Sequence, residues 1–205
     1  MHGKFIVMEG IDGAGKGLQC RLLGERLAES GKKVFITEEP TKGRIGELIR
    51  GYLKEHDAPP ELMALLFAAD RKEHVEEILN LLKRGYTVIS ERYLFSSLAY
   101  QSSQGVDEGW IWEINRFAIL PDIAILLDVS PEVSLKRLSE SRERKEIFEN
   151  EEFLRRVRGK YLEIFTREDE RMRTIRRIIV HAERTPEEIS EEIWMRIRDD
   201  GNGDD

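Results

Sequence analysis

The chain is poor in cysteine and has no long apolar run near its start. Cys20 is the single cysteine among 205 residues, which excludes a disulfide within one chain and fits a reducing compartment. The first apolar run, Phe5–Met8, is too short for the core of a signal peptide or for a membrane span. We therefore expect a soluble, cytoplasmic protein without a membrane partner.

Positive charge is also in deficit. Lysine and arginine together number 33 against 40 acidic residues, so the formal net charge is −7. This balance argues against a protein that holds nucleic acid through bulk electrostatics, although a local basic site can still bind phosphates. The 4 histidines show no metal-ligand spacing, so the sequence predicts no zinc site.

Along the chain, short apolar runs alternate with longer helical patterns. This alternation is typical of an α/β domain whose parallel strands are buried on both faces. We expect one domain over residues 1–205, built as a five-stranded parallel sheet with helices on both faces, and an acidic tail over 199–205 that frays. The expected strands are Phe5–Glu9, Val34–Thr37, Thr87–Ser90, Ile123–Val129 and Arg177–His181. The expected helices cover residues 16–30, 43–55, 60–84, 107–118, 131–140, 149–172 and 186–198.

The strongest local motif is a glycine-rich loop between the first expected strand and the first expected helix. Small residues let backbone N–H groups wrap phosphate oxygens, and the helix N-terminus adds partial positive charge. Lys16 supplies a further charge to the β- and γ-phosphates. The alternative is an ordinary tight turn, but the glycines and the lysine stand in the register of an ATP-binding P-loop. The loop residues are Gly10, Ile11, Asp12, Gly13, Ala14, Gly15, Lys16 and Gly17.

Position 17 departs from this motif. The motif has serine or threonine after the lysine, where the hydroxyl ligates Mg²⁺, and this chain has Gly17. Phosphate wrapping is a backbone function and survives the change, whereas direct metal ligation from this position does not. We therefore predict an active but slow enzyme with a raised Mg²⁺ requirement. Gly17→Thr, which restores the hydroxyl, is expected to raise the rate.

Further blocks along the chain are similar to those of one kinase family. They are Glu9–Gln19, Thr37–Pro40, Leu66–His74, Glu91–Gln101, Pro121–Val129 and Phe148–Tyr161. Together they resemble the thymidylate kinase family of P-loop nucleoside monophosphate kinases. The Glu91–Gln101 block is the most specific, although that family's signature commonly begins with aspartate where this chain has Glu91. The resemblance implies transfer of the γ-phosphoryl group of ATP to dTMP, with Mg²⁺ as cofactor and a homodimer as the assembly.

The resemblance also implies a set of catalytic residues. Glu91 and Arg92 follow the third strand, and ligands of such sheets bind beyond the carboxyl ends of the strands. Arg92 would bridge the donor and acceptor phosphates beside Lys16, and Glu91 would hold Mg²⁺ through water. The alternative is a mutual ion pair at the end of a strand.

A basic, polar stretch matches the position of the family's lid over ATP, at residues of about 139–148. Its Arg142 and Arg144 would supply a cation that the phosphate loop of this chain lacks. The alternative is a solvated run of charge.

An acceptor site for dTMP follows from the same resemblance. Phe67 lies four residues before Arg71, so the thymine ring would stack on Phe67 while Arg71 takes the dTMP phosphate. Tyr100 would pack against the sugar and favour deoxyribose, and Ser97 and Gln101 would offer hydrogen bonds along the base edge. The remaining expected contacts come from Asp12, Glu39 and Arg92.

Two other functions stay open at this point. In the first, the acceptor is dUMP or a deoxynucleoside, and for a deoxynucleoside Glu91 or Glu39 would serve as the base for the acceptor hydroxyl. The second is a sensor that keeps the nucleotide pocket without catalysis, which Gly17 favours and which the intact Lys16 opposes. Release of ADP in the presence of dTMP, dUMP and thymidine in turn separates these functions.

Overall fold

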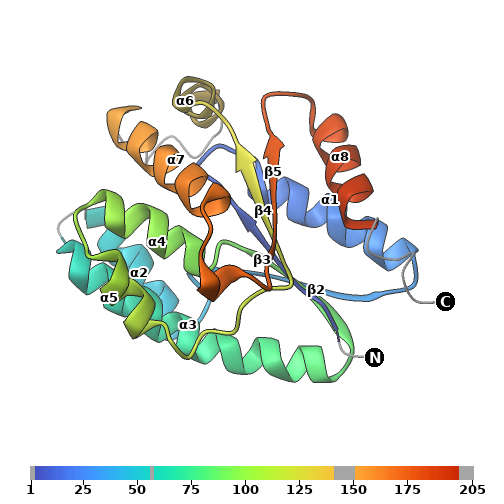
Figure 1. The fold of residues 1–205 in the computed structure, drawn as a ribbon, viewed down its shortest axis with the longest axis horizontal. Coiled ribbons are helices and arrows are strands. Elements are labelled where there is room, and N and C mark those ends of the chain that lie inside the picture. Colours follow the sequence, from blue (N-terminus) through green and yellow to red (C-terminus); the bar gives the residue numbers. More distant parts are fainter. Residues whose placement is uncertain (1–2, 56–57, 141–150, 199–205) are drawn as a thin grey trace.

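The computed structural model describes residues 3–55, 58–140 and 151–198 of the chain. Its strands form one parallel sheet in the order β2-β3-β1-β4-β5 (Figure 1). The expected five-stranded parallel sheet is thus confirmed, with every strand end within one residue of its expected place. The strands are β1 (Phe5–Glu9), β2 (Lys33–Glu38), β3 (Tyr86–Glu91), β4 (Ile123–Asp128) and β5 (Arg176–His181).

Helices cover both faces of this sheet, also as expected. α1 and α8 lie on one face, and α3, α4 and α7 lie on the other, with α2 packed outside on α3 and α5 on α4 (Figure 1). No helix in the described ranges is long and apolar enough to span a bilayer. The helices are α1 (Lys16–Glu29), α2 (Arg44–Glu55), α3 (Pro60–Lys83), α4 (Leu94–Ser103), α5 (Glu108–Ile114), α6 (Pro131–Glu140), α7 (Glu151–Thr166) and α8 (Pro186–Arg198), with a 3₁₀ turn at Glu170–Met172.

Two helices end earlier than the sequence predicts, and α4 is a helix that the expected ranges do not include. α5 stops because the Asn115 side chain donates to the carbonyl oxygen of Ile111 at 2.8 Å, in place of a backbone N–H of a continuing helix. α7 stops because Arg177 of β5 donates to the carbonyl oxygens of Ile164 and Arg167 at 2.7 and 2.8 Å. In both cases a side chain takes the carbonyls that further helical turns would need.

The hydrophobic core follows the inner strands. β1 is buried along its whole length, and β4 is buried except at its last residue. The prediction that every strand is buried on both faces is wrong for β2, in which each residue is either exposed or only partly buried. β2 is the last strand of the sheet, so its outer edge has no neighbouring strand, and Ile36 stays 42% exposed.

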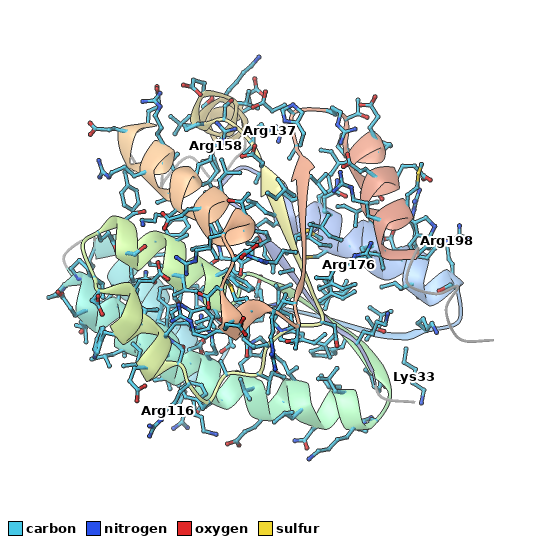
Figure 2. All side chains as sticks on the ribbon, in the orientation of Figure 1. Lys33, Arg116, Arg137, Arg158, Arg176 and Arg198 are labelled. Atoms are coloured by element: carbon cyan, nitrogen blue, oxygen red, sulfur yellow. The ribbon has the colours of Figure 1, made fainter. Side chains whose placement is uncertain are left out.

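All strands run in one direction, so their carboxyl ends meet at one edge of the sheet. Met8 of β1 and Glu38 of β2 both pair with Glu91 of β3, which brings the ends of three strands together. Figure 2 shows Arg137 and Arg158 at the same edge, beside the ends of β4 and β5. This edge is the place to look for a ligand site.

Candidate active site

The phosphate loop joins the end of β1 to the start of α1. Gly10, Gly13 and Gly15 have positive φ angles there, of 144°, 75° and 90°. A Cβ atom at Gly13 would lie 2.7 Å from the carbonyl oxygen of Ser134, so this turn requires glycine on two counts. Ser134 of α6 also donates its hydroxyl to the carbonyl oxygen of Asp12. α6 therefore supports the loop from behind, which the sequence motif did not reveal.

Lys16, the first residue of α1, turns back into this loop. Its ammonium donates to the carbonyl oxygen of Ile11 at 2.9 Å and lies 3.9 Å from a carboxylate oxygen of Asp12. Burial of the side chain, followed by the charge of Arg92, lowers the pKa of Lys16. A negatively charged ligand in the loop would offset both effects, which is the electrostatic setting of a phosphate site.

Arg92, directly after β3, reaches across to the phosphate loop. Its guanidinium donates to Asp12 and lies over the ring of Tyr100, 5.0 Å from the ring centroid. Its φ of 64° is uncommon for arginine, and hydrogen bonds to Met8 and from Ser90 hold the backbone there at 2.9 and 2.7 Å. Burial would raise the pKa of Asp12, but the neighbouring cations outweigh burial and lower it.

A buried polar network lies beside the site, between α3 and α4. Arg71 is 1% exposed and donates twice to one Glu39 oxygen, at 2.7 and 3.0 Å. It also donates to Asn115 at 2.6 Å and to Ser97 at 3.1 Å. The other Glu39 oxygen lies 3.0 Å from His74. These bonds use four of the five guanidinium N–H groups and both carboxylate oxygens, so the network is largely satisfied within the protein.

Three other expected acceptor residues lie on α3 and α4. Phe67 is partly exposed on α3 and lies outside the core cluster of the described residues. Gln101 is 5% exposed, and its side-chain oxygen has no hydrogen-bond partner in the described part of the chain. Tyr100, one residue earlier on α4, approaches Asp12 with its hydroxyl at 3.4 Å. A buried amide oxygen without a partner is costly unless a ligand supplies a donor.

Glu9, the last residue of β1, is a site residue that sequence reasoning did not single out. One carboxylate oxygen accepts from the Tyr93 backbone at 2.9 Å, and the other accepts from Ser96 at 2.6 Å and Tyr161 at 3.1 Å. Burial raises the pKa of Glu9 to about 7, against the opposing hydrogen bond of Ser96 and the charge of Arg92. An acidic residue at the end of an otherwise apolar buried strand was the signal available in the sequence.

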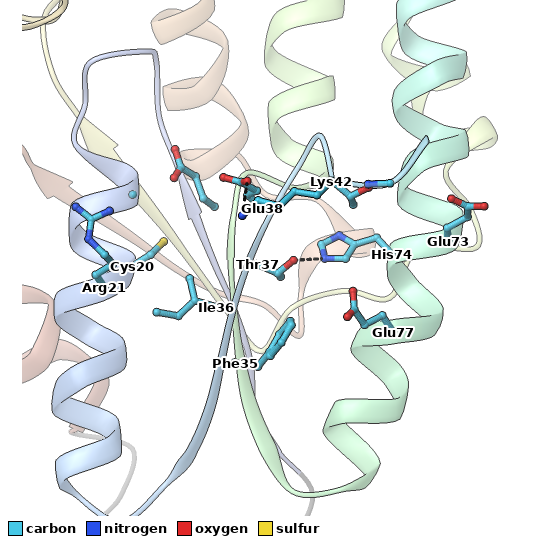
Figure 3. Close-up of a pocket in the computed structure, with 14 residues that line it drawn as sticks. Cys20, Arg21, Phe35, Ile36, Thr37, Glu38, Lys42, Glu73, His74 and Glu77 are labelled. Atoms are coloured by element: carbon cyan, nitrogen blue, oxygen red, sulfur yellow. Dashed lines mark hydrogen bonds and ion pairs between the residues drawn. The ribbon is translucent and has the colours of Figure 1, made fainter. Parts of the chain in front are cut away.

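Glu91 lies in a cleft of about 590 Å³ around β2, between α1 and α3, which we call the β2 cleft (Figure 3). Figure 3 also shows the hydrogen bond between Thr37 and His74 on the α3 side of this cleft, at 2.8 Å. Gly17 lines the cleft too, and a Cβ atom there would lie 2.7 Å from a Glu91 carboxylate oxygen. A side chain at position 17 would therefore require the Glu91 carboxylate to shift, and the expectation that Gly17→Thr raises the rate stays a prediction.

The expected lid, at residues of about 139–148, begins at the end of α6. Residues 139 and 140 are the last residues of α6, whereas residues 141–150, with Arg142 and Arg144, lie outside the described residues. In the described ranges, no group of three or more histidine, cysteine or acidic residues could hold a metal ion by itself. Mg²⁺ needs only one or two carboxylates beside substrate phosphates, so a single Glu91 suits it.

A phosphate loop and a neighbouring arginine at the carboxyl edge of a parallel sheet place the chain among the ATP-dependent nucleotide kinases, a class of transferases. Residues 8–193 match the family model described as thymidylate kinase. The chain therefore belongs to the thymidylate kinase family, and the resemblance seen in its motifs is confirmed.

Relatives support this assignment over nearly the full length. A protein of Methanococcus aeolicus named probable thymidylate kinase is 46% identical over 199 residues, covering 96% of both chains. A protein of the same name from Pyrococcus abyssi is 42% identical over 205 residues, covering 97% of both chains. A third, from Pyrococcus horikoshii, is 44% identical over 171 residues, covering 80% of this chain and 83% of its own.

Proposed function

We propose that this protein transfers the γ-phosphoryl group of ATP to dTMP in the cytoplasm, giving ADP and dTDP. The observation that carries this proposal is the position of Arg92. Its guanidinium bonds to Asp12 of the phosphate loop on one side and lies over Tyr100 of α4 on the other. It thus stands between the donor phosphates and the expected acceptor residues, where charge moves during the transfer.

The proposed transfer asks the chain for positioning and charge neutralisation. Backbone N–H groups of the loop from Gly10 to Gly17 would hold the ATP phosphates, with Lys16 on the β- and γ-phosphates. Arg92 would neutralise the group in flight, and Arg142 and Arg144 are proposed to add positive charge from the lid. The acceptor oxygen of dTMP is already an anion, so no general base is needed.

Mg²⁺ is the proposed cofactor. When bound to ATP, it offsets phosphate charge and orients the transferred group. The carboxylate of Glu91 suits it, because its oxygens make no hydrogen bond or ion pair with the described residues, and oxygen is the ligand atom that Mg²⁺ prefers. We propose that Glu91 reaches the ion through water.

For the acceptor, the contacts inside the protein favour a division of roles between two arginines. Arg71 has four of its five N–H groups engaged, so it suits a single neutral oxygen of dTMP better than a phosphate. We therefore propose that the dTMP phosphate binds Arg92 near Asp12, and that Glu39 acts through Arg71 by holding it in place.

The base and the sugar would meet α3 and α4. Phe67 offers a partly exposed ring for stacking on thymine. The unpartnered amide oxygen of Gln101 suits the N–H of a pyrimidine, with Ser97 beside it. Tyr100 would pack against the sugar and leave little room for a 2′-hydroxyl.

A homodimer is also proposed. Leu48 and Leu53 of α2 and Leu65 of the adjacent α3 are 49, 45 and 47% exposed. These apolar side chains on neighbouring helices are groups that a second copy would cover. Sedimentation analysis of the chain tests the state directly.

A coupled assay of ADP release tests the activity. Rates are measured with dTMP, dUMP and thymidine in turn, with Lys16→Ala as the variant that should lose transfer while keeping its fold. We expect dTMP to give the highest kcat/KM. A preference for dUMP or thymidine would replace the acceptor, and binding of ATP and dTMP without any ADP release would make the protein a sensor.

A further inference from the structure

The first turn of α1 packs directly against the end of β3. A Cβ atom built on Gly17 would lie 2.7 Å from the Oε2 atom of Glu91 and 3.7 Å from its Cδ atom. Ordinary contact begins at 3.4 Å, so a side chain at position 17 would force the carboxylate to retreat by 0.7 Å or to swing away. The Glu91 carboxylate therefore fills the volume in which the side chain of a P-loop serine or threonine would stand.

The backbone of Glu91 is well fixed, whereas its side chain is available. Glu91 pairs with Met8 and Glu38 in the sheet, and its carbonyl oxygen accepts from the Glu39 backbone at 2.9 Å. Its carboxylate makes no hydrogen bond or ion pair with the described residues, and it borders the open β2 cleft. Its charge also acts on the neighbouring Lys16, opposing the fall in the pKa of that lysine.

The first turn of α1 lacks the groups that commonly serve a helix N-terminus. No side chain caps it, because the N-cap is Gly15, and the first turn contains no acidic residue. A carboxylate oxygen of Glu91, from the neighbouring strand, stands beside this turn without a hydrogen bond to the described residues.

We propose that Gly17 and Glu91 are a matched pair, in which the strand carboxylate takes over the metal-facing position of the missing P-loop hydroxyl. Glycine at position 17 makes room for the carboxylate, and the glutamate at position 91 is long enough to reach that room. This inference rests on the proposed use of Mg²⁺ with ATP. It assigns Gly17 a positive role, where the motif alone indicated a defect.

The proposal makes the effects of the two positions interdependent. Gly17→Ala adds a methyl group that displaces the carboxylate and brings no oxygen, so metal binding should weaken. Glu91→Asp withdraws the carboxylate by one methylene, so metal binding should weaken again. In the double variant Gly17→Thr with Glu91→Asp, the hydroxyl occupies the vacated space, and metal binding should recover.

The test uses electron paramagnetic resonance to measure the binding of Mn²⁺ to the full chain in the presence of a non-hydrolysable ATP analogue. No acceptor is present, so the result is independent of which acceptor the enzyme uses. Gly17→Ala and Glu91→Asp should each weaken Mn²⁺ binding about fivefold or more, and Gly17→Thr with Glu91→Asp should return it to within about threefold of the unchanged chain.

Gly159 provides the matched control, because it lies within helix α7 and nothing stands within 4 Å of a Cβ atom built there. Gly159→Ala should leave Mn²⁺ binding unchanged. Thermal unfolding without ligand checks that each variant is folded, and alanine at position 17 should favour the helix. Weaker metal binding in a folded Gly17→Ala chain therefore cannot come from lost structure.

Two outcomes would overturn the pairing. In the first, Gly17→Ala binds Mn²⁺ as well as Gly159→Ala does, so the space at position 17 does not matter. In the second, Gly17→Thr alone strengthens Mn²⁺ binding, which means that the threonine hydroxyl and the Glu91 carboxylate can occupy the site together. An unchanged chain that binds the analogue but no Mn²⁺ would overturn the pairing and the proposed cofactor, while leaving the nucleotide site intact.

Discussion

Arg92 and Asp12 are 80 residues apart in the chain, and the guanidinium of one donates to the carboxylate of the other. The bond joins the end of β3 to the phosphate loop that follows β1, two adjacent strands of the sheet. Asp12 is 46% exposed, whereas Arg92 is 16% exposed, so the pair lies at the mouth of the site. Asp12 therefore fixes the direction of the arginine that we place between the two substrates.

Replacement of Arg92 should affect turnover more than stability. Arg92→Ala removes the cation proposed to neutralise the transferred group, and such losses commonly cost about 100- to 1000-fold in kcat. Arg92→Lys keeps the charge without the planar fork of the guanidinium, so its kcat should lie between that of Arg92→Ala and that of the unchanged chain. Steady-state rates at saturating ATP and dTMP measure the effect. Arg116→Ala, at an exposed arginine of the surface, serves as the control, and a kcat for Arg92→Ala within threefold of it would remove Arg92 from the transfer step.

Removal of Arg71 should destabilise the folded protein, because it leaves the Glu39 carboxylate buried without its cation. We expect Arg71→Ala to lower the free energy of unfolding by about 3–5 kcal/mol. Pairing Arg71→Met with Glu39→Gln should restore part of that loss. Urea denaturation measures it, and Arg156→Ala, which removes an exposed ion pair and a contact with the Phe153 ring, should change stability little. If Arg71→Ala were as stable as Arg156→Ala, the buried network would not support the fold.

The buried Glu9 predicts a pH dependence of stability. Its pKa in the folded chain is about 7, against an ordinary value of 4.5, so the folded state holds the proton more tightly than the unfolded state. The contribution of Glu9 is fully present below pH 4.5 and is lost as pH rises through about 7, by roughly 3 kcal/mol in total. Glu9→Gln should therefore flatten the fall of stability over this interval in urea denaturation at a series of pH values. An equal slope in both proteins would place the titration on other groups.

Gln101 should separate ligand binding from stability. Its amide oxygen has no partner in the described part of the chain, so Gln101→Met removes a polar atom that contributes nothing to the free protein. We expect thermal stability to be kept or raised, while the KM for dTMP rises roughly 5- to 150-fold through the loss of about 1–3 kcal/mol. The KM for ATP should stay unchanged. A parallel loss of stability and of binding for both substrates would make Gln101 a packing residue.

Local signals in the sequence were enough for the elements and for the phosphate loop. The strands were visible because buried parallel strands are nearly continuous in apolar residues, and α6 and α8 begin at Pro131 and Pro186 as their helix-start signals predicted. The loop was visible because its glycines and Lys16 must be close in the chain to wrap one phosphate. α5 and α7 were overextended, because the residues that end them, Asn115 and Arg177, act through side-chain bonds that periodicity does not show.

The tertiary structure alone decided how these pieces work together. Arg71 was visible as a site residue, but its pairing with Glu39 and Asn115 joins positions 32 and 44 residues apart. In the same way Gly17 appeared as a missing hydroxyl until the fold set it against Glu91. The reason is that a motif records short-range backbone requirements, whereas volume, burial and charge at a point depend on every segment that the fold brings there.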